Sequence, residues 1–355
     1  MDSGLENVVA AETILSDVDG QNGRLIIRGW PVQLLAASAA YEDAAHLLWA
    51  GFFDNLPDVA GLAARLAEAR NAAFALVRKI PSGLDTVSFL RTGWSLLRDD
   101  ESLDTAILLA AAAPVFTAAA VRAEQGRPAI APDPALSQSA DVLRMLTGKM
   151  PSEAEARALD AYLVTVSDHG LNASTFTARV VASTRAGLVS ASVAGLSALK
   201  GPLHGGAPGP VLDMIDEIGT PENAESWIDD ALARGDRLMG FGHRVYRVRD
   251  PRADALKAAV ARLPGTSGRL AFAEQIEKAV LGRLAKKYPA RPLDTNVEFY
   301  TALLLEALGI PRAAFTAVFA TGRVLGWTAH AREQVAEGRI VRPRSVYTGP
   351  VPEPA

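Results

Sequence analysis

From Tyr41 onward, the apolar residues of this 355-residue chain recur at helical spacings almost without interruption. Apolar side chains that return every three or four positions line one face of an α-helix, and Gly, Pro and Asp separate each segment from the next. Only residues 12–28 differ, because short β-like runs there flank a turn at 19–23 and predict a small hairpin. We therefore expect an all-α fold that begins with a short N-terminal β-hairpin.

Most of the expected helices are separated by short turn sequences. The segment 172–199 is rich in Ala, Ser, Thr and Gly and almost free of charge, which indicates one helix buried on all sides. Four more charged helices are expected between 211 and 287. The other expected helices are 41–53, 58–80, 85–100, an alanine-rich helix ending near 126, a helix ending near 150, 153–167, 296–309 and 311–337.

Two hydrophobic features bear on the location of the protein. The longest apolar run, 106–121, has 16 residues and contains Pro114, and we expect a buried helix because the run is too short to span a bilayer. The first 15 residues lack a basic segment followed by an apolar one, so no signal peptide is expected. These features predict a cytoplasmic protein.

Charge and cysteine content exclude several classes of protein. The formal net charge is −4, so no overall field draws the chain to nucleic acid or to an anionic membrane, and neither is expected as a partner. The chain has no cysteine, which excludes disulfides, thiol catalysis and thiolate metal sites and fits a reducing compartment.

The stretch 237–254 is the richest in residues that could carry chemistry. It holds His243 and five arginines. Gly240 and Gly242 come just before the histidine, so the backbone there can approach a ligand closely or take positive φ. The spacing of four between His243 and Arg247 would place both side chains on one face of a helical turn.

Asp250 and Pro251 predict the start of a new helix, because they are typical of the N-cap and the first helical position. Arg252 then lies in the first turn and is directed back toward His243. An imidazole among several guanidinium groups suits an anionic ligand with a reacting carbon. The alternative, a solvated basic loop, would not require the glycines.

The five histidines divide into two groups. His169, His204 and His243 occupy irregular, glycine-marked positions, which favours a role for each in a site. A structural histidine bonded to a backbone carbonyl remains an equal alternative for each of them. His46 and His330 lie within expected helices, and we interpret them as structural.

Other kinds of site fit the sequence less well. Three histidines with Glu298 could form a zinc shell, but they lack short ligand spacing and the nearby arginines would repel a cation, so no metal is expected. The sequence GFGHRV lacks the Gly-Lys-Ser/Thr ending of a phosphate-binding loop. A dinucleotide-binding unit is excluded because no strand precedes any glycine cluster.

Several separated motifs stand in a fixed order: DHGLNAST, GPLHGG, MGFGHRVYRVRDPRAD, NVEFY and a late Gly-Arg followed by RPRS. Their order and spacing resemble the citrate synthase family, as does the opening GLENVVAAETILSDVDGQNGRLIIRG. The resemblance spans nearly the whole chain and is strongest to the shorter, dimeric bacterial and archaeal members.

The resemblance implies an acyltransferase that condenses an acyl-CoA, usually acetyl-CoA, with oxaloacetate to give citrate and CoA, with no cofactor beyond the acyl-CoA substrate. By the same resemblance Glu298 is the base that removes the methyl proton. His204 would donate to the enol or enolate oxygen. His243 would polarise the oxaloacetate carbonyl and protonate the new alkoxide.

The resemblance also implies how the substrates are held. Bidentate guanidinium groups match carboxylates in geometry as well as charge. The residues expected to bind oxaloacetate or citrate are His169, Arg252, Arg323 and Arg342, the last supplied by the neighbouring subunit, and those expected at the CoA site are Arg247, Gly240 and Gly242.

The domain organisation expected from the resemblance is a large and a small helical domain. The glycine- and proline-rich stretch 201–210 marks a boundary. We expect the large domain to comprise residues 1–206 and 310–355, with the small domain at 207–309. The chain is expected to form a homodimer in which the C-terminal tail reaches the partner.

The sequence departs from the family at three places. Glu298 stands where the family has aspartate, residues 207–210 read Ala-Pro-Gly-Pro instead of beginning Ala-Asn-Glu, and Val166 and Gly170 replace a histidine and an acidic residue. Only the first touches the chemistry. Because Thr295 and Ala302 near it also differ from the family, we expect a backbone adjusted to the longer side chain.

Two alternatives to citrate synthesis remain open. One is 2-methylcitrate synthesis from propionyl-CoA, since one methylene in an acyl pocket is worth only about 1–3 kcal/mol. The other is a catalytically weak paralogue that binds the oxo acid or CoA as a sensor or partner.

Overall fold

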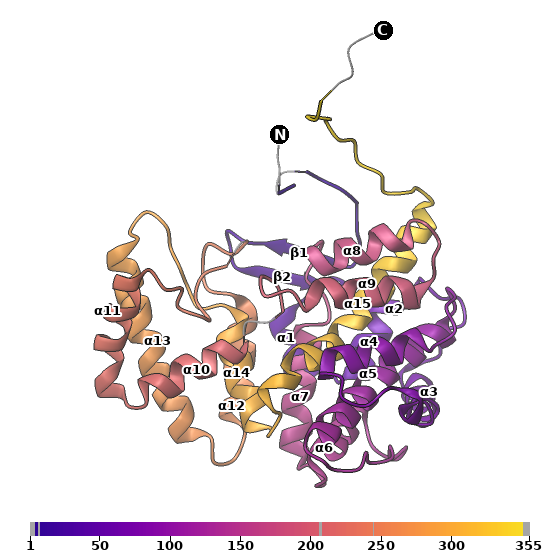
Figure 1. The fold of residues 1–355 in the computed structure, drawn as a ribbon, viewed down its shortest axis with the longest axis horizontal. Coiled ribbons are helices and arrows are strands. Elements are labelled where there is room, and N and C mark those ends of the chain that lie inside the picture. The colour runs from indigo at the N-terminus through magenta and orange to yellow at the C-terminus, as the bar shows by residue number, and fades with distance from the viewer. Residues whose placement is uncertain (1–3, 6–7, 206–207, 244, 351–355) are drawn as a thin grey trace.

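The computed structural model describes residues 4–5, 8–205, 208–243 and 245–350, and these residues are mainly α-helical (Figure 1). Side chains at the N-caps start many of the helices, as Asp58, Ser102 and Ser152 do by accepting a hydrogen bond from the backbone three residues on. The all-α prediction is confirmed. The α-helices are α1 Val32–Ser38, α2 Tyr41–Trp49, α3 Val59–Phe74, α4 Thr86–Ser95, α5 Leu103–Glu124, α6 Gln138–Thr147, α7 Glu153–Thr165, α8 Ala173–Ala182, α9 Leu188–Leu199, α10 Pro208–Ile218, α11 Ala224–Arg234, α12 Pro251–Ala261, α13 Ser267–Lys287, α14 Val297–Ala307 and α15 Phe315–Glu337, with short 3₁₀ turns at Val77–Lys79, Pro221–Asn223 and Arg312–Ala314.

The predicted N-terminal hairpin is present as an antiparallel sheet. Strands β1 (Ser16–Asp19) and β2 (Arg24–Ile27) pair so that Asp19 lies opposite Arg24. The side chain of Asp19 accepts hydrogen bonds from the backbone of the turn that follows, which fixes the turn. A third short strand, β3 (Trp30–Pro31), continues the sheet in the order β1-β2-β3 and leads directly into α1, which the sequence did not predict.

Helix α5 lies at the centre of the helical body and packs against α3, α4, α6 and α15. It has 22 residues and is therefore longer than the apolar run that predicted it, and by length and composition alone it could cross a membrane. Within the protein, 89% of its most apolar window is buried. The expectation of a buried helix is confirmed, whereas the argument that the helix is too short to span a bilayer is wrong.

The segment 172–199 is two helices, so the single helix expected there is wrong. Between α8 and α9 the backbone takes positive φ at Arg185 and Gly187. The carboxylate of Asp99 caps the N-terminus of α9, although Asp99 is distant in sequence. It accepts hydrogen bonds from the backbone of Val189 at 2.8 Å and of Ser190 at 2.9 Å. A Cβ on Gly187 would lie 2.0 Å from that carboxylate, which explains the glycine.

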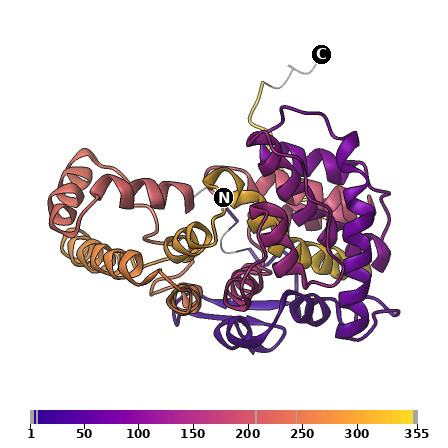
Figure 2. The same cartoon turned by 90° about the horizontal axis from the view of Figure 1, so that it is seen from below.

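Two groups of helices make up the molecule. Helices α10–α14 gather on one side in both views, and α2–α6, α8 and α9 on the other (Figures 1 and 2). Packing of α12 against α1 and α7, and of α14 against α7, joins the two groups. Helix α15 returns to the larger group and packs along α2, α5, α7, α8 and α9. The predicted division at 206/207 and 309/310 stays a prediction.

Candidate active site

The loop before α12 is held against the segment before α14. The backbone of Asn296 donates to the carbonyl of Gly240 at 2.9 Å, and its side chain donates to the carbonyl of Gly242 at 2.8 Å. Both glycines have positive φ, as the sequence predicted, at 87° and 80°. A Cβ on either would lie 2.9 Å from the side chain of Phe299 or Leu293. Glycine is therefore required at both positions because side chains of this protein lie close to the backbone there. The expected contact of the two glycines with CoA stays a prediction.

His243 lies in this loop, whose described residues are not helical. The prediction that His243 and Arg247 share one face of a helical turn is therefore wrong. The ring instead folds over its own loop, and Nδ1 accepts hydrogen bonds from the backbone of Val245 at 3.0 Å and Tyr246 at 3.1 Å. Because Nδ1 accepts, the proton of the neutral ring is on Nε2. Burial, together with the charge of Arg252, lowers the pKa of His243 to about 4. At neutral pH the residue therefore presents an uncharged Nε2–H donor.

Tyr246 links two of the predicted histidines. Its hydroxyl lies 3.1 Å from Nε2 of His169, and its ring centroid lies 4.8 Å from that of His243. The guanidinium carbon of Arg252 lies 5.9 Å from the centre of the tyrosine ring. Burial first, and then the charge of Arg252, hold the pKa of His169 well below its usual range. Tyr246 was not predicted as a site residue, although an aromatic residue among several arginines was the signal that the sequence offered.

Arg252 lies in the first turn of α12, where the sequence predicted it. Asp250 caps this helix by accepting from the backbone of Arg252 at 3.0 Å. The same carboxylate accepts from Nε at 3.0 Å and from Nη2 at 2.7 Å, so the pair is bidentate and buried. Asp250 also accepts from the backbone of Val297 and thereby joins α12 to α14. The other terminal nitrogen, Nη1, makes no hydrogen bond to any residue that the structure describes.

Arg323 projects from α15 and is buried, with a relative exposure of 1%. Its Nε donates to the carbonyl of Val166 at 2.6 Å, and its guanidinium carbon lies 4.9 Å from the ring centre of Phe319. Its Nη1 is buried without a hydrogen-bond partner among the described residues. Burial lowers the pKa of Arg323 to about 10, although the charge of Asp168 opposes this. A buried cationic donor without an acceptor is costly and indicates an anionic ligand at this point.

His204 follows α9 and is partly buried. Its Nε2 lies 2.8 Å from Oγ of Ser174, a hydroxyl that also accepts from Nε1 of Trp327 at 3.2 Å. Burial and the charge of Arg323 lower the pKa of His204 to about 4. The imidazole is therefore neutral at pH 7, which suits a hydrogen-bond donor to a developing oxyanion. Ser174 was not predicted from the sequence.

Glu298 lies in the first turn of α14, where the side chain of Asn296 caps the helix by accepting from its backbone at 3.0 Å. Burial raises the pKa of Glu298 to about 7, the charge of Asp250 adds to this, and Arg252 and Arg323 oppose it. A carboxyl group that titrates near neutral pH is matched to accepting a proton from carbon and returning it.

A protein-family profile described as citrate synthase, C-terminal domain, matches residues 4–344. The chain belongs to the citrate synthase family. It is 36% identical to the citrate synthase of Haloferax volcanii, over 98% of this chain and 95% of that protein. It is 35% identical to a 2-methylcitrate synthase of Mycobacterium tuberculosis, over 98% of this chain and 90% of that protein. A citrate synthase from Thermoplasma acidophilum, solved as a ternary complex with carboxymethyl coenzyme A and oxaloacetate, shares the fold with a TM-score of 0.88 and 29% identity over 100% of this chain and 98% of the other.

In this member of the citrate synthase family, six of the predicted site residues lie close enough to influence one another's ionisation. The pKa of His169 is lowered by four of the others, and that of Glu298 responds to two of them. Three of them lie on helices and three in the loops before α8, α10 and α12. The helical residues are Arg252 on α12, Glu298 on α14 and Arg323 on α15, and the loop residues are His169, His204 and His243.

Two other predicted residues do not join this cluster within one chain. Arg247 is exposed on the loop before α12, and its backbone donates to the carbonyl of Gly20 in the hairpin. Arg342 is exposed in the tail that leaves the body after α15 (Figure 1). In the described parts of the chain, no group of three or more His, Asp or Glu side chains is arranged to hold a metal ion, so the zinc alternative finds no support.

Proposed function

We propose that this chain condenses acetyl-CoA with oxaloacetate and, with water, releases citrate and CoA. The observation that carries this proposal is a group of four side chains: the buried Nη1 of Arg323, which has no hydrogen-bond partner among the described residues, two neutral histidines and a carboxyl group of raised pKa. An anion-binding arginine, two uncharged donors and a base are the groups that carbanion chemistry on a thioester requires.

The first step removes a proton from the methyl carbon of acetyl-CoA. The ionised carboxylate of Glu298 accepts this proton, and the electron pair moves onto the thioester oxygen. His204 donates a hydrogen bond to that oxygen. Nε2 of His204 lies 2.8 Å from Oγ of Ser174, whose single proton is also within hydrogen-bond distance of Oδ1 of Asn172. The step requires that this proton be donated to Nε2, so that the other ring nitrogen of His204 is protonated and free to donate.

The second step forms the new carbon–carbon bond. Arg252, Arg323 and His169 hold the carboxylates of oxaloacetate, and Nε2–H of His243 donates to its ketone oxygen. The enol carbon attacks the ketone carbon, and the resulting alkoxide takes the proton from His243. Water then attacks the thioester of the product; one of its protons leaves with CoA as the thiol, and the other is released from the new carboxylic acid. The proton held by Glu298 returns through solvent to His243, so both groups regain their starting states. The reaction balances without a further cofactor.

Propionyl-CoA is the second candidate substrate, because a 2-methylcitrate synthase is among the relatives. We expect CoA release from acetyl-CoA with oxaloacetate to show a higher kcat/KM than release from propionyl-CoA, measured in parallel with a thiol reagent. A higher kcat/KM for propionyl-CoA would reverse the choice of substrate. Release from neither would favour the catalytically weak paralogue.

We further propose a cytoplasmic homodimer in which the C-terminal tail completes the partner's site. The backbone of Val341 donates to Oγ of Ser183 at 3.0 Å, which fixes the start of the tail on the body. On either side of it Ile340, Val346 and Tyr347 are exposed apolar side chains, which suits a surface that a second copy covers. Arg342 lies among them and would reach oxaloacetate, while Arg247, Gly240 and Gly242 would contact CoA.

Truncation before Gly338 is therefore expected to raise the KM for oxaloacetate at least tenfold, since a charge-assisted hydrogen bond is worth about 1.5–3 kcal/mol. Steady-state kinetics measure this change. Arg342→Ala in the full chain is the matched control, because it removes the charge and keeps the tail. Sedimentation that shows a fully active monomer would contradict the dimer.

A further inference from the structure

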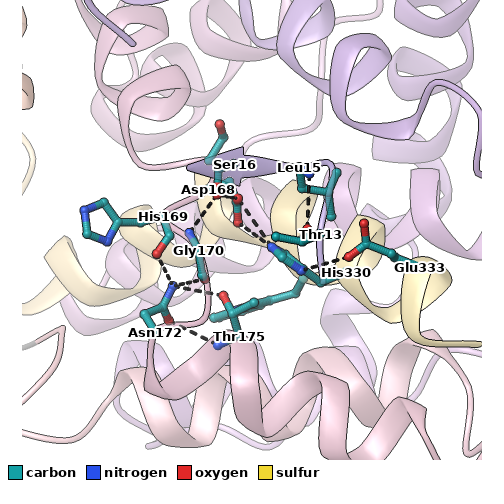
Figure 3. Close-up of polar contacts among 12 residues, drawn as sticks. Thr13, Leu15, Ser16, Asp168, His169, Gly170, Asn172, Thr175, His330 and Glu333 are labelled. Carbon is teal, nitrogen blue, oxygen red and sulfur yellow. Dashed lines mark hydrogen bonds and ion pairs between the residues drawn. The ribbon is translucent and has the colours of Figure 1, made fainter. Parts of the chain in front are cut away.

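The segment that carries His169 is held by a buried polar network outside the six-residue cluster (Figure 3). Asp168 and His330 both have a relative exposure of 0%. Nε2 of His330, on α15, lies 3.1 Å and 3.3 Å from the two carboxylate oxygens of Asp168. Ser16, in strand β1, donates to the same carboxylate at 2.5 Å. A fully buried carboxylate is costly unless such partners satisfy it, so the arrangement is specific.

The neighbours of His330 determine which tautomer its neutral ring adopts. Its Nδ1 lies 3.1 Å from Nη1 of Arg179, which can only donate. In the neutral ring the proton is therefore on Nε2 and points at Asp168. Glu333 pairs with Arg179 and also accepts from the backbone of Ile14 at 2.9 Å. The network thus ties α8, α15 and the segment before β1 to the turn after α7.

Helix α15 approaches that turn so closely that only glycine fits. A Cβ on Gly326 would lie 2.3 Å from the carbonyl oxygen of Ser167 and 2.8 Å from the carboxylate of Asp168. Arg323, Gly326 and His330 are spaced by three and four, so they share one face of α15. The face of α15 that carries Arg323, the arginine proposed to bind oxaloacetate, therefore also packs against the turn that bears His169.

The other side of the turn is fixed by β1 and α8. The backbone of Gly170 donates to Oγ of Ser16 at 2.8 Å. The side chain of Asn172, which caps α8, donates to the carbonyl of Gly170 at 3.2 Å. With its backbone clamped from both sides, the ring of His169 projects away from Asp168 and His330 (Figure 3).

We propose that His330 and Ser16 are positioning residues, which act through Asp168 to set the orientation of His169 toward oxaloacetate. This inference rests on the proposed function, in which His169 holds a substrate carboxylate. From its place in the sequence His330 is interpreted as structural, whereas this proposal gives it a role in substrate binding through Asp168. Both residues act on substrate binding only through His169, which holds the oxo acid. Their replacement is therefore expected to weaken the binding of the oxo acid and to leave the binding of acyl-CoA unchanged.

Ser16→Ala is the primary test, because Ser16 is only partly buried and its loss leaves the helical body intact. We expect the KM for oxaloacetate to rise about fivefold to tenfold, with the KM for acetyl-CoA unchanged. This is less than the loss of a charge-assisted hydrogen bond to the substrate itself, because Ser16 acts through Asp168. His330→Leu is expected to raise the KM for oxaloacetate at least tenfold, and His330→Gln, which keeps a donor near Nε2, to restore it within about threefold. His46→Leu, a matched histidine replacement on α2, is the control.

Calorimetric titration with oxaloacetate alone separates this inference from the proposed function. If the wild type does not bind oxaloacetate, the proposed function fails. If the wild type binds it and Ser16→Ala binds it equally well, the positioning role is overturned while the function stands. An equal rise in the KM for acetyl-CoA would also overturn it, because a general loss of structure moves both constants. Should His330→Leu fail to fold, Ser16→Ala and His330→Gln decide the question.

Discussion

Replacement of Arg323 by leucine is expected to raise the KM for oxaloacetate by roughly 10- to 100-fold, because a charge-assisted hydrogen bond typically contributes about 1.5–3 kcal/mol. The buried Nη1 has no acceptor among the described residues, so its acceptor is expected to be a substrate carboxylate. A planar, forked guanidinium group is needed at this position, because Nε already donates to the carbonyl of Val166 while Nη1 is left for the substrate. Steady-state kinetics with oxaloacetate varied at saturating acetyl-CoA measure the effect.

Two variants control this experiment. Arg332→Leu removes an arginine from the same helix, where it donates to the carbonyl of Phe52, and should leave the KM for oxaloacetate unchanged. Arg323→Lys keeps the charge but not the planar fork, and should recover only part of the affinity. An unchanged KM in Arg323→Leu would place the oxo acid elsewhere.

Arg252→Leu is expected to raise the same KM but to cost stability as well. Its guanidinium group satisfies the buried carboxylate of Asp250, which caps α12 and accepts from the backbone of Val297. Removing one partner of a buried pair leaves an uncompensated charge, which typically costs about 3–5 kcal/mol. The midpoint of denaturation should therefore be measured with the kinetics. Nothing in the sequence shows the partner of Arg252, so this expected loss of stability follows from the structure alone.

Local signals were sufficient for much of the fold and for the start of α12. The hairpin follows from its turn residues, and Asp250 with Pro251 begins α12 because capping depends on neighbours in sequence. The break between α8 and α9 could not be predicted, because the cap of α9 is the carboxylate of Asp99 from another segment. Helix α1 was missed because its seven residues follow β3 without a break.

The site shows the same division between local and long-range information. Positive φ at Gly240 and Gly242 was foreseen from the residue type, whereas the tautomer of His243 depends on how the loop folds over the ring. The contacts of Tyr246 with His169 and of Ser174 with His204 join residues at separations of 77 and 30 positions. No spacing rule brings such pairs together, since they arise from the packing of the helices.

The largest effect is expected for Glu298→Gln, which should lower kcat by about 1,000-fold or more, within the 10²–10⁴-fold range of general acid–base catalysis. The amide has nearly the same shape but cannot accept the methyl proton. Binding of oxaloacetate, measured by calorimetry, should be nearly unchanged, because Arg252 and Arg323 remain. A variant that loses oxaloacetate binding to the same extent as activity would show that Glu298 supports the site and is not its base.

The pH dependence tests the same residue without a substitution. Burial raises the pKa of Glu298 to about 7, and only the ionised form can act as the base. The wild-type kcat/KM should therefore rise as pH increases through about 7 and approach a plateau above it. A carboxyl group of ordinary pKa would leave the profile flat over that range. The residual activity of Glu298→Gln should lack this step.

Glu298→Asp decides whether the glutamate is an adaptation or a defect. The backbone before Glu298 is fixed by the cap from Asn296 and by the pairing of Asn296 with Gly240, so a shorter side chain cannot move forward to recover the distance. A displacement of about 1 Å at a reacting group can cost on the order of 100-fold, and we expect a loss of that size in kcat. Thermal denaturation should be nearly unchanged, since aspartate is also favourable in the first turn of a helix. If Glu298→Asp instead has a higher kcat than the wild type, the site is built for aspartate. That result would favour the catalytically weak paralogue over citrate synthesis.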